Sequence, residues 1–162
     1  MTGFDFFLAV LFVIGIAIEM KRGFGRAIFD VLALYSALVV GAYVAPTLAG
    51  GIPGIGPSGA AFAECQITTF VTVSAVFLIL ARFIATAVPL SMGMFDALGG
   101  FGAGVVCAVI FCHGIVAALA TGDSQQAAAL SGGLSQQLLT FSSYHQLVDG
   151  INFAMSNHLD NT

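Results

Sequence analysis

Long apolar runs dominate the chain, and charged residues occur at intervals between them. Two of the runs, 31–63 and 97–122, contain no Asp, Glu, Lys or Arg. A helix that crosses a hydrocarbon core of about 30 Å needs about 20 apolar residues. The pattern therefore predicts an all-α integral membrane fold with four transmembrane helices, at Phe4–Met20, Ala27–Ala45, Ile67–Val88 and Leu98–Ala120. Membrane-spanning strands would instead require alternating polar and apolar residues, and these runs are continuous.

The two segments outside these runs differ from each other. Residues 46–59, PTLAGGIPGIGPSG, contain three prolines and five glycines, a composition that predicts a non-helical loop on the membrane surface or a re-entrant segment. The tail, residues 123–162, begins with Asp123 or Ser124 as a helix cap and breaks at Gly132–Gly133. Beyond the break, apolar residues recur at spacings near three and four, which predicts one amphipathic helix: Leu134, Leu138, Phe141, Val148, Ile151, Met155 and Leu159. We divide the chain into a four-helix domain, 1–122, and this tail.

Composition agrees with a membrane location. Hydrophobic residues make up 59% of the chain and charged residues 7%, against roughly 25% charged in soluble domains. So few charges could not hydrate the surface of a soluble domain, and the net charge of −4 excludes a nucleic-acid binder, which needs a basic face.

Basic residues indicate the orientation. Lys21, Arg22 and Arg26 lie in the link between the first two spans, and the positive-inside rule places this link in the cytoplasm. Both termini and the tail are then expected outside the cytoplasmic membrane. Arg82 falls in the cytoplasmic half of the third span, in agreement with this topology.

Small residues form smooth ridges on two of the predicted helices. Ala33, Ala37 and Gly41 follow one another at spacing four on the second span, and Gly100 and Gly104 do so on the fourth. Small residues allow helices in lipid to approach closely. The two ridges therefore predict that the second and fourth helices meet closely, within one chain or across an oligomer.

Ionisable residues inside a membrane mark candidate functional positions. The candidates deepest in the spans are Arg82 and His113. Arg82 either extends to the surface or pairs with Asp30 or Asp96, and we predict the pair with Asp30. Glu19 with Arg22, three residues apart, and Arg26 with Asp30, four apart, are possible local pairs.

No catalytic, cofactor or metal site emerges from the pattern. Cys107 and Cys112 lie about 140° apart around a helix, and His113 a further 100° round, so the three do not converge on a metal. Cys65 has no local partner. Nucleotide-binding and hydrolase motifs are missing, so we expect a protein that is not an enzyme and has no cofactor.

Two segments resemble the colicin V production (CvpA) family of bacterial inner-membrane proteins. The first is the link Arg22-Gly23-Phe24-Gly25-Arg26, which leads to Asp30; the second begins the fourth span with Asp96 and continues to Gly100 and Gly104. The resemblance covers about residues 4–120. This chain has Ala97 where the family usually has a basic residue.

The resemblance implies a multi-pass inner-membrane protein that supports colicin V or toxin production or export and envelope homeostasis. As a non-enzymatic structural or assembly factor it would contact the lipid bilayer and either copies of itself or other membrane proteins. Two other functions remain open. One is an oligomeric solute or ion pathway with Arg82 and His113 facing the lumen, and the other is an accessory subunit of a larger membrane complex.

Overall fold

The computed structural model describes residues 2–56, 58–88, 93–122 and 130–139, and these form helices joined by short links. Four helices are long and apolar enough to cross a membrane, which confirms the all-α membrane fold: α1 (Gly3–Arg22), α2 (Phe24–Gly51), α3 (Ala60–Ala87) and α4 (Asp96–Ala120). A 3-10 turn, η1 (Gly93–Phe95), precedes α4, and a short helix, α6 (Gly133–Leu139), belongs to the tail.

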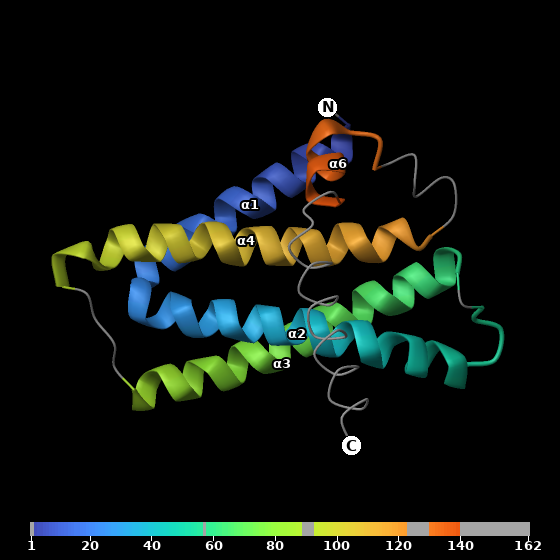
Figure 1. Cartoon of the computed structure of the whole chain (residues 1–162), viewed down its shortest axis with the longest axis horizontal. Helices are drawn as coiled ribbons and strands as arrows, with labels where there is room; N and C mark the ends of the chain where they lie inside the picture. The colour runs from blue at the N-terminus through green and yellow to red at the C-terminus, as the bar shows by residue number, and fades with distance from the viewer. Residues whose placement is uncertain (1, 57, 89–92, 123–129, 140–162) are drawn as a thin grey trace, which may run out of the picture.

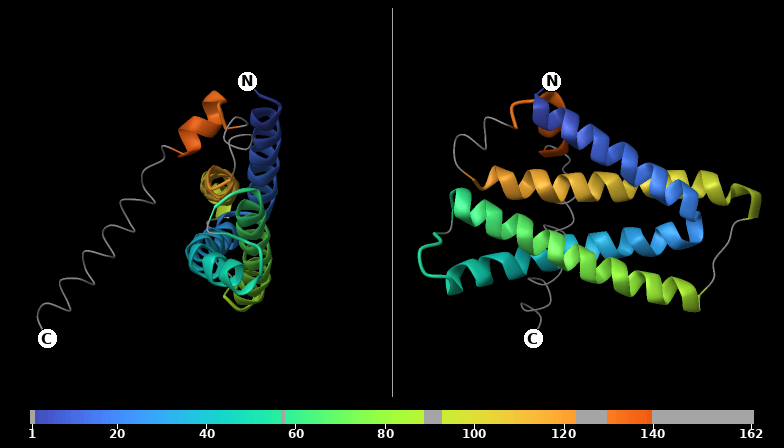
Figure 2. Two further views of the ribbon diagram at one scale, coloured as in Figure 1. Left: turned by 90° about the vertical axis from the view of Figure 1, so that its right-hand side faces the viewer. Right: turned by 180° about the vertical axis from the view of Figure 1, so that it is seen from behind.

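The long helices run in alternate directions, so the α1–α2 link and the start of α4 lie at one end of the bundle (Figure 1). We call this the basic end, because Lys21, Arg22 and Arg26 lie there. Helix α2 packs along α3, and α4 packs along both α1 and α2. Helices α1 and α3 lie on the same face of the bundle (Figure 2).

The second and third spans are longer than the sequence predicted. Helix α2 continues through Pro46 to Gly51, and α3 begins at Ala60, so the predicted non-helical loop 46–59 is wrong for residues 46–51. Proline is tolerated within helices of membrane proteins because neighbouring groups compensate for the lost hydrogen bond. Ala45 and Ala49 are almost fully buried on either side of Pro46, so packing favours continuation of the helix.

Glycines of the two ridges lie against helices α3 and α1. On α2, Ala33, Ala37 and Gly41 are buried, and a Cβ atom on Gly41 would lie 3.5 Å from Cα of Phe70 on α3.

The ridge on α4 lies against α1. A Cβ atom on Gly104 would lie 3.1 Å from Cα of Ile16. Helices α2 and α4 are neighbours, as predicted, but Gly100 and Gly104 of the α4 ridge face α1. Small residues allow a neighbouring backbone to approach closely, and Gly100 and Gly104 receive the backbone of α1 at Glu19, Gly23 and Ile16.

Helix α6 lies beside the first turns of α1 and the second half of α4 (Figures 1 and 2). Leu138 joins Leu8, Cys112 and Val116 in a hydrophobic core. The start of α6 at Gly133 agrees with the predicted break. The predicted helix caps Asp123 and Ser124, and the part of the amphipathic helix after Leu139, lie outside the described residues.

Two glycines of α4 provide a direct test of this packing. A Cβ atom on Gly100 would lie 2.8 Å from the Glu19 carbonyl oxygen, whereas one on Gly102 would meet no atom within 4 Å. We expect Gly100→Ala to lower the free energy of unfolding by about 1–3 kcal/mol through overpacking. Gly102→Ala should be neutral or stabilising by about 0.5–1 kcal/mol, because alanine favours the helix. Thermal unfolding in mild detergent measures both; equal melting temperatures would show that α1 does not pack on this glycine.

Candidate functional site

The α1–α2 link is fixed to the start of α4 by one carboxylate. The backbone N–H of Phe24 donates a hydrogen bond to Oδ1 of Asp96 over 3.0 Å. Phe24 is the first residue of α2, where the backbone N–H groups have no partner within the helix. Asp96 is itself the first residue of α4. Its negative charge therefore lies at the amino-terminal ends of two helices, where the helix dipoles favour it.

Glycines make this contact possible. Gly23 has a φ of +81°, which glycine adopts without strain, and a Cβ atom there would overlap the Asp96 carboxylate. Gly99 receives the ring of Phe24, and Gly100 lies directly under the backbone of Glu19 and Gly23. The two family-like segments of the sequence thus form one packed unit. We call it the turn–helix joint, residues 19–24 against 96–104.

Arg22 holds two carboxylates beside this joint. Its Nη1 atom lies 3.2 Å from Oε1 of Glu19 and 2.5 Å from Oδ2 of Asp30. Both acidic residues are buried, and the Arg22 side chain keeps 25% of its exposure. We call these three residues the Arg22 cluster. The possible pair between Glu19 and Arg22 is therefore present.

The predicted partner of Asp30 is wrong. Within the described residues Arg82 makes no ion pair, although its charge acts on Asp30 from a longer distance, and Asp30 pairs with Arg22 instead of Arg82 or Arg26. Arg26 is exposed. The physical reason is the tight turn at Gly23, which brings the end of α1 against the second turn of α2. Arg82 must reach the same carboxylate from a separate helix.

Arg82 faces a cavity of about 190 Å³, which we call the basic-end cavity. All four long helices contribute to its wall, and its polar residues are Glu19, Arg22 and Arg82. Apolar side chains, including Ile18, Leu78 and Phe111, make up most of the remainder.

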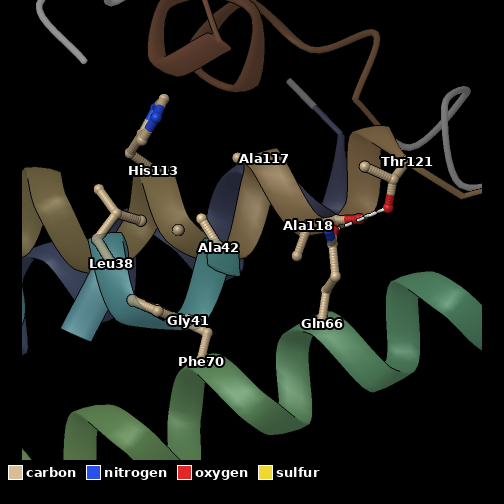
Figure 3. A pocket seen from close by; sticks show the side chains of 10 residues that line it. Leu38, Gly41, Ala42, Gln66, Phe70, His113, Ala117, Ala118 and Thr121 are labelled. Atoms are coloured by element: carbon tan, nitrogen blue, oxygen red, sulfur yellow. Dashed lines mark hydrogen bonds between the residues drawn. The ribbon is translucent and has the colours of Figure 1, made fainter. Parts of the chain in front are cut away.

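A second cavity of about 190 Å³ lies between α2, α3 and α4 toward the opposite end (Figure 3). Gln66 extends from α3 to the end of α4, where the Thr121 hydroxyl donates to its Oε1 over 3.0 Å. The ring of Phe70 packs on Gly114 in its wall, and also against Phe111, which lines the basic-end cavity. These rings lie between the two cavities.

His113 belongs to the wall of this second cavity, but its imidazole ring is turned toward α6. Figure 3 shows its ring directed away from Leu38 and Gly41, and its Nδ1 atom lies 2.9 Å from the Leu138 carbonyl oxygen of α6. Within one copy of the chain, His113 and Arg82 therefore belong to the walls of different cavities. Helix α6 covers this face of α4, and the imidazole supplies a polar contact for it.

A buried carboxylate that sequence reasoning missed also holds α6. Asp5 is fully buried and accepts hydrogen bonds from the hydroxyl and the backbone N–H of Ser135, over 2.8 and 3.2 Å. Thr2 and Asp5 also form a reciprocal cap of α1. The three-residue spacing of Thr2 and Asp5 is typical of a helix start and could have been recognised in the sequence. The contact with Ser135 could not, because Ser135 is distant in the chain.

The described residues contain no group of His, Cys, Asp or Glu that could hold a metal ion. Cys107 and Cys112 are buried, and Cys65 is partly exposed. The polar groups that do converge bind to one another and join helices. Their chemistry is that of a structural joint beside a polar cavity.

The Arg22 cluster predicts unequal effects of two neighbouring arginines. Arg22→Ala leaves two buried carboxylates without their cation, so we expect the free energy of unfolding to fall by about 3 kcal/mol. This value is at the low end for buried ion pairs because Arg22 is partly exposed. Arg26→Ala removes an exposed charge at the same end and should change stability by less than about 0.5 kcal/mol. Chemical or thermal unfolding in detergent checks both values. A stable Arg22→Ala variant would show that the cluster does not hold α1 to α2.

Comparison with known proteins agrees with these structural segments. The family model described as colicin V production protein matches residues 4–151, which extends beyond the expected 4–120 into the tail and includes α6. Neither a curated protein nor a solved structure was found to match the chain. Because the family model spans most of the sequence and contains both halves of the turn–helix joint, the chain belongs to the colicin V production (CvpA) family.

Proposed function

We propose that this protein is a non-enzymatic structural or assembly factor that supports the production or export of colicin V-type toxins and envelope homeostasis. The Arg22 cluster and Asp96 carry this proposal, because their charges join helices. Asp5 and His113 likewise hold α6 to the bundle. Charged groups used in this way stabilise a particular shape of the bundle.

Apolar surface on the same helices supports contact with lipid and with other proteins. Large hydrophobic side chains such as Phe6, Phe83 and Leu98 are about two-thirds exposed or more. Lipid covers most of such surface in a multi-pass inner-membrane protein. We propose that part of it binds copies of this chain or helices of other membrane proteins, either as a homo-oligomer or as an accessory subunit of a larger complex.

A solute or ion pathway is the second candidate, and the observation that favours it is the basic-end cavity with Arg82 in its wall. The packed rings of Phe70 and Phe111 separate this cavity from the second one. A pathway through one copy of the chain therefore requires these rings to move. An assembly factor requires no such movement, and for this reason we favour it.

A toxin-release assay tests the proposed function. In a strain that makes colicin V and lacks its own family member, we expect this chain to restore toxin release. Gly100→Leu should fail to restore it, because the joint cannot close, and Gly102→Leu should behave as the wild type. The growth-inhibition zone on a sensitive lawn, divided by total toxin on an immunoblot, measures release. Unchanged release with the wild-type chain would contradict the proposal.

The orientation can be tested through Cys65. It is partly exposed, whereas Cys107 and Cys112 are buried and serve as internal controls. If the basic end faces the cytoplasm, an impermeant thiol reagent added to cells with a permeable outer membrane should label Cys65. The Cys65→Ser variant should show no labelling. Labelling that appears after the inner membrane is opened, and not before, would reverse the proposed orientation.

A further inference from the structure

One oxygen of the Arg22 cluster is buried without a hydrogen-bond donor. Oε2 of Glu19 has no partner among the described residues, although the Glu19 side chain keeps 8% of its exposure. Glu19 belongs to the wall of the basic-end cavity. The last side-chain torsion of Glu19, χ3, has a broad range, so the carboxylate can turn either oxygen toward the cavity. A buried oxygen of this kind requires a donor.

The charges around the cavity indicate the chemistry of that donor. Glu19 and Asp30 share one nitrogen of Arg22 and lie close enough to interact with each other, so two acidic groups have one cation within ion-pair distance. Arg82 lies in the same wall, acts on Asp30 electrostatically from a longer distance, and makes no ion pair within the described residues. The cavity therefore offers a carboxylate oxygen without an N–H donor and a guanidinium that is available to an anion. A zwitterion with an ammonium and an anionic group satisfies both.

We propose that the basic-end cavity binds the headgroup of a phospholipid that carries a primary amine, with the ammonium at Glu19 and the phosphate at Arg82. Helices α1 and α3 lie on one face of the bundle (Figure 2), and the cavity is lined by these two helices together with α2 and α4. Exposed apolar side chains on both helices, among them Ile18 and Phe83, provide a surface for acyl chains. The volume of about 190 Å³ equals that of about six waters, which suits a headgroup but not whole acyl chains.

This assignment predicts a specific lipid preference. Ethanolamine carries an ammonium that donates hydrogen bonds, whereas the quaternary ammonium of choline carries the same charge and donates none. A phosphoglycerol headgroup offers the phosphate to Arg82 but has no cation for Glu19. Hydrogen bonds to a charged group contribute about 1.5–3 kcal/mol, which corresponds to a preference of about tenfold or more.

Native mass spectrometry of the full chain measures this preference. The purified protein is exchanged into detergent with phosphatidylethanolamine, phosphatidylcholine or phosphatidylglycerol of identical acyl chains. We expect phosphatidylethanolamine to be retained at about tenfold lower concentration than the other two. Equal retention of the ethanolamine and choline lipids by the wild-type protein would overturn the proposal, since a proton would then suffice as the partner of Glu19. This comparison requires no variant to fold.

Two variants locate the site. Glu19→Gln keeps the size and an acceptor for Arg22, and it should abolish the preference for ethanolamine over choline. Arg82→Gln changes an exposed side chain and should weaken the binding of both lipids about fivefold. The matched control is Arg26→Gln, which removes an exposed charge at the same end but outside the cavity wall. It should change neither the binding of the two lipids nor the preference between them. An Arg82→Gln variant that retains lipid like the control would overturn the proposal.

Free ethanolamine phosphate separates a lipid site from a site for a soluble zwitterion. It carries both charged groups and lacks acyl chains. We expect that it neither displaces phosphatidylethanolamine nor raises the melting temperature at concentrations where the lipid does. Stabilisation by the free compound equal to that by the lipid would overturn the assignment to a lipid.

Discussion

The close approach of α1 and the start of α2 to the glycine face of α4 is the constraint on which the rest of the structure depends. Gly100 and Gly104 let the backbone of α1 lie directly on α4, and Asp96 accepts the hydrogen bond of Phe24 at the same place. Helices in lipid gain little from hydrophobic burial against one another, so this packing and the polar contact must supply the association. The position of the turn then brings Arg22 to Asp30.

Burial of charge in this bundle has both a structural and a functional consequence. In a low-dielectric interior a carboxylate must have a partner, and Arg22 supplies one to Glu19 and Asp30 together. One cation cannot satisfy every oxygen of two carboxylates. The remaining oxygen of Glu19 makes the basic-end cavity polar, with Arg82 facing the same space. The Arg22 cluster, which joins α1 to α2, thus also leaves a site suited to the proposed zwitterionic headgroup.

The opposite end of the bundle is held by different chemistry. Asp5 and His113 bind α6 through Ser135 and the Leu138 carbonyl oxygen, and Thr121 binds Gln66 across the ends of α3 and α4. These contacts join segments that are distant in sequence. A membrane domain held together at both ends, with exposed apolar faces between them, supports the proposed role in assembly.

The sequence by itself determined the fold class, the four spans and the two family-like segments, because the length of an apolar run and the position of basic residues report directly on a bilayer. It also marked Gly100, Gly104 and Asp96 as structurally special. Tertiary structure alone decided which helices meet: the ridge of α4 faces α1, and Asp30 pairs with Arg22 and not with Arg82. It likewise decided that α2 continues through Pro46 and that His113 faces α6. Periodicity shows that a helix has a smooth or polar face, but the partner of that face depends on how all the helices fill space together.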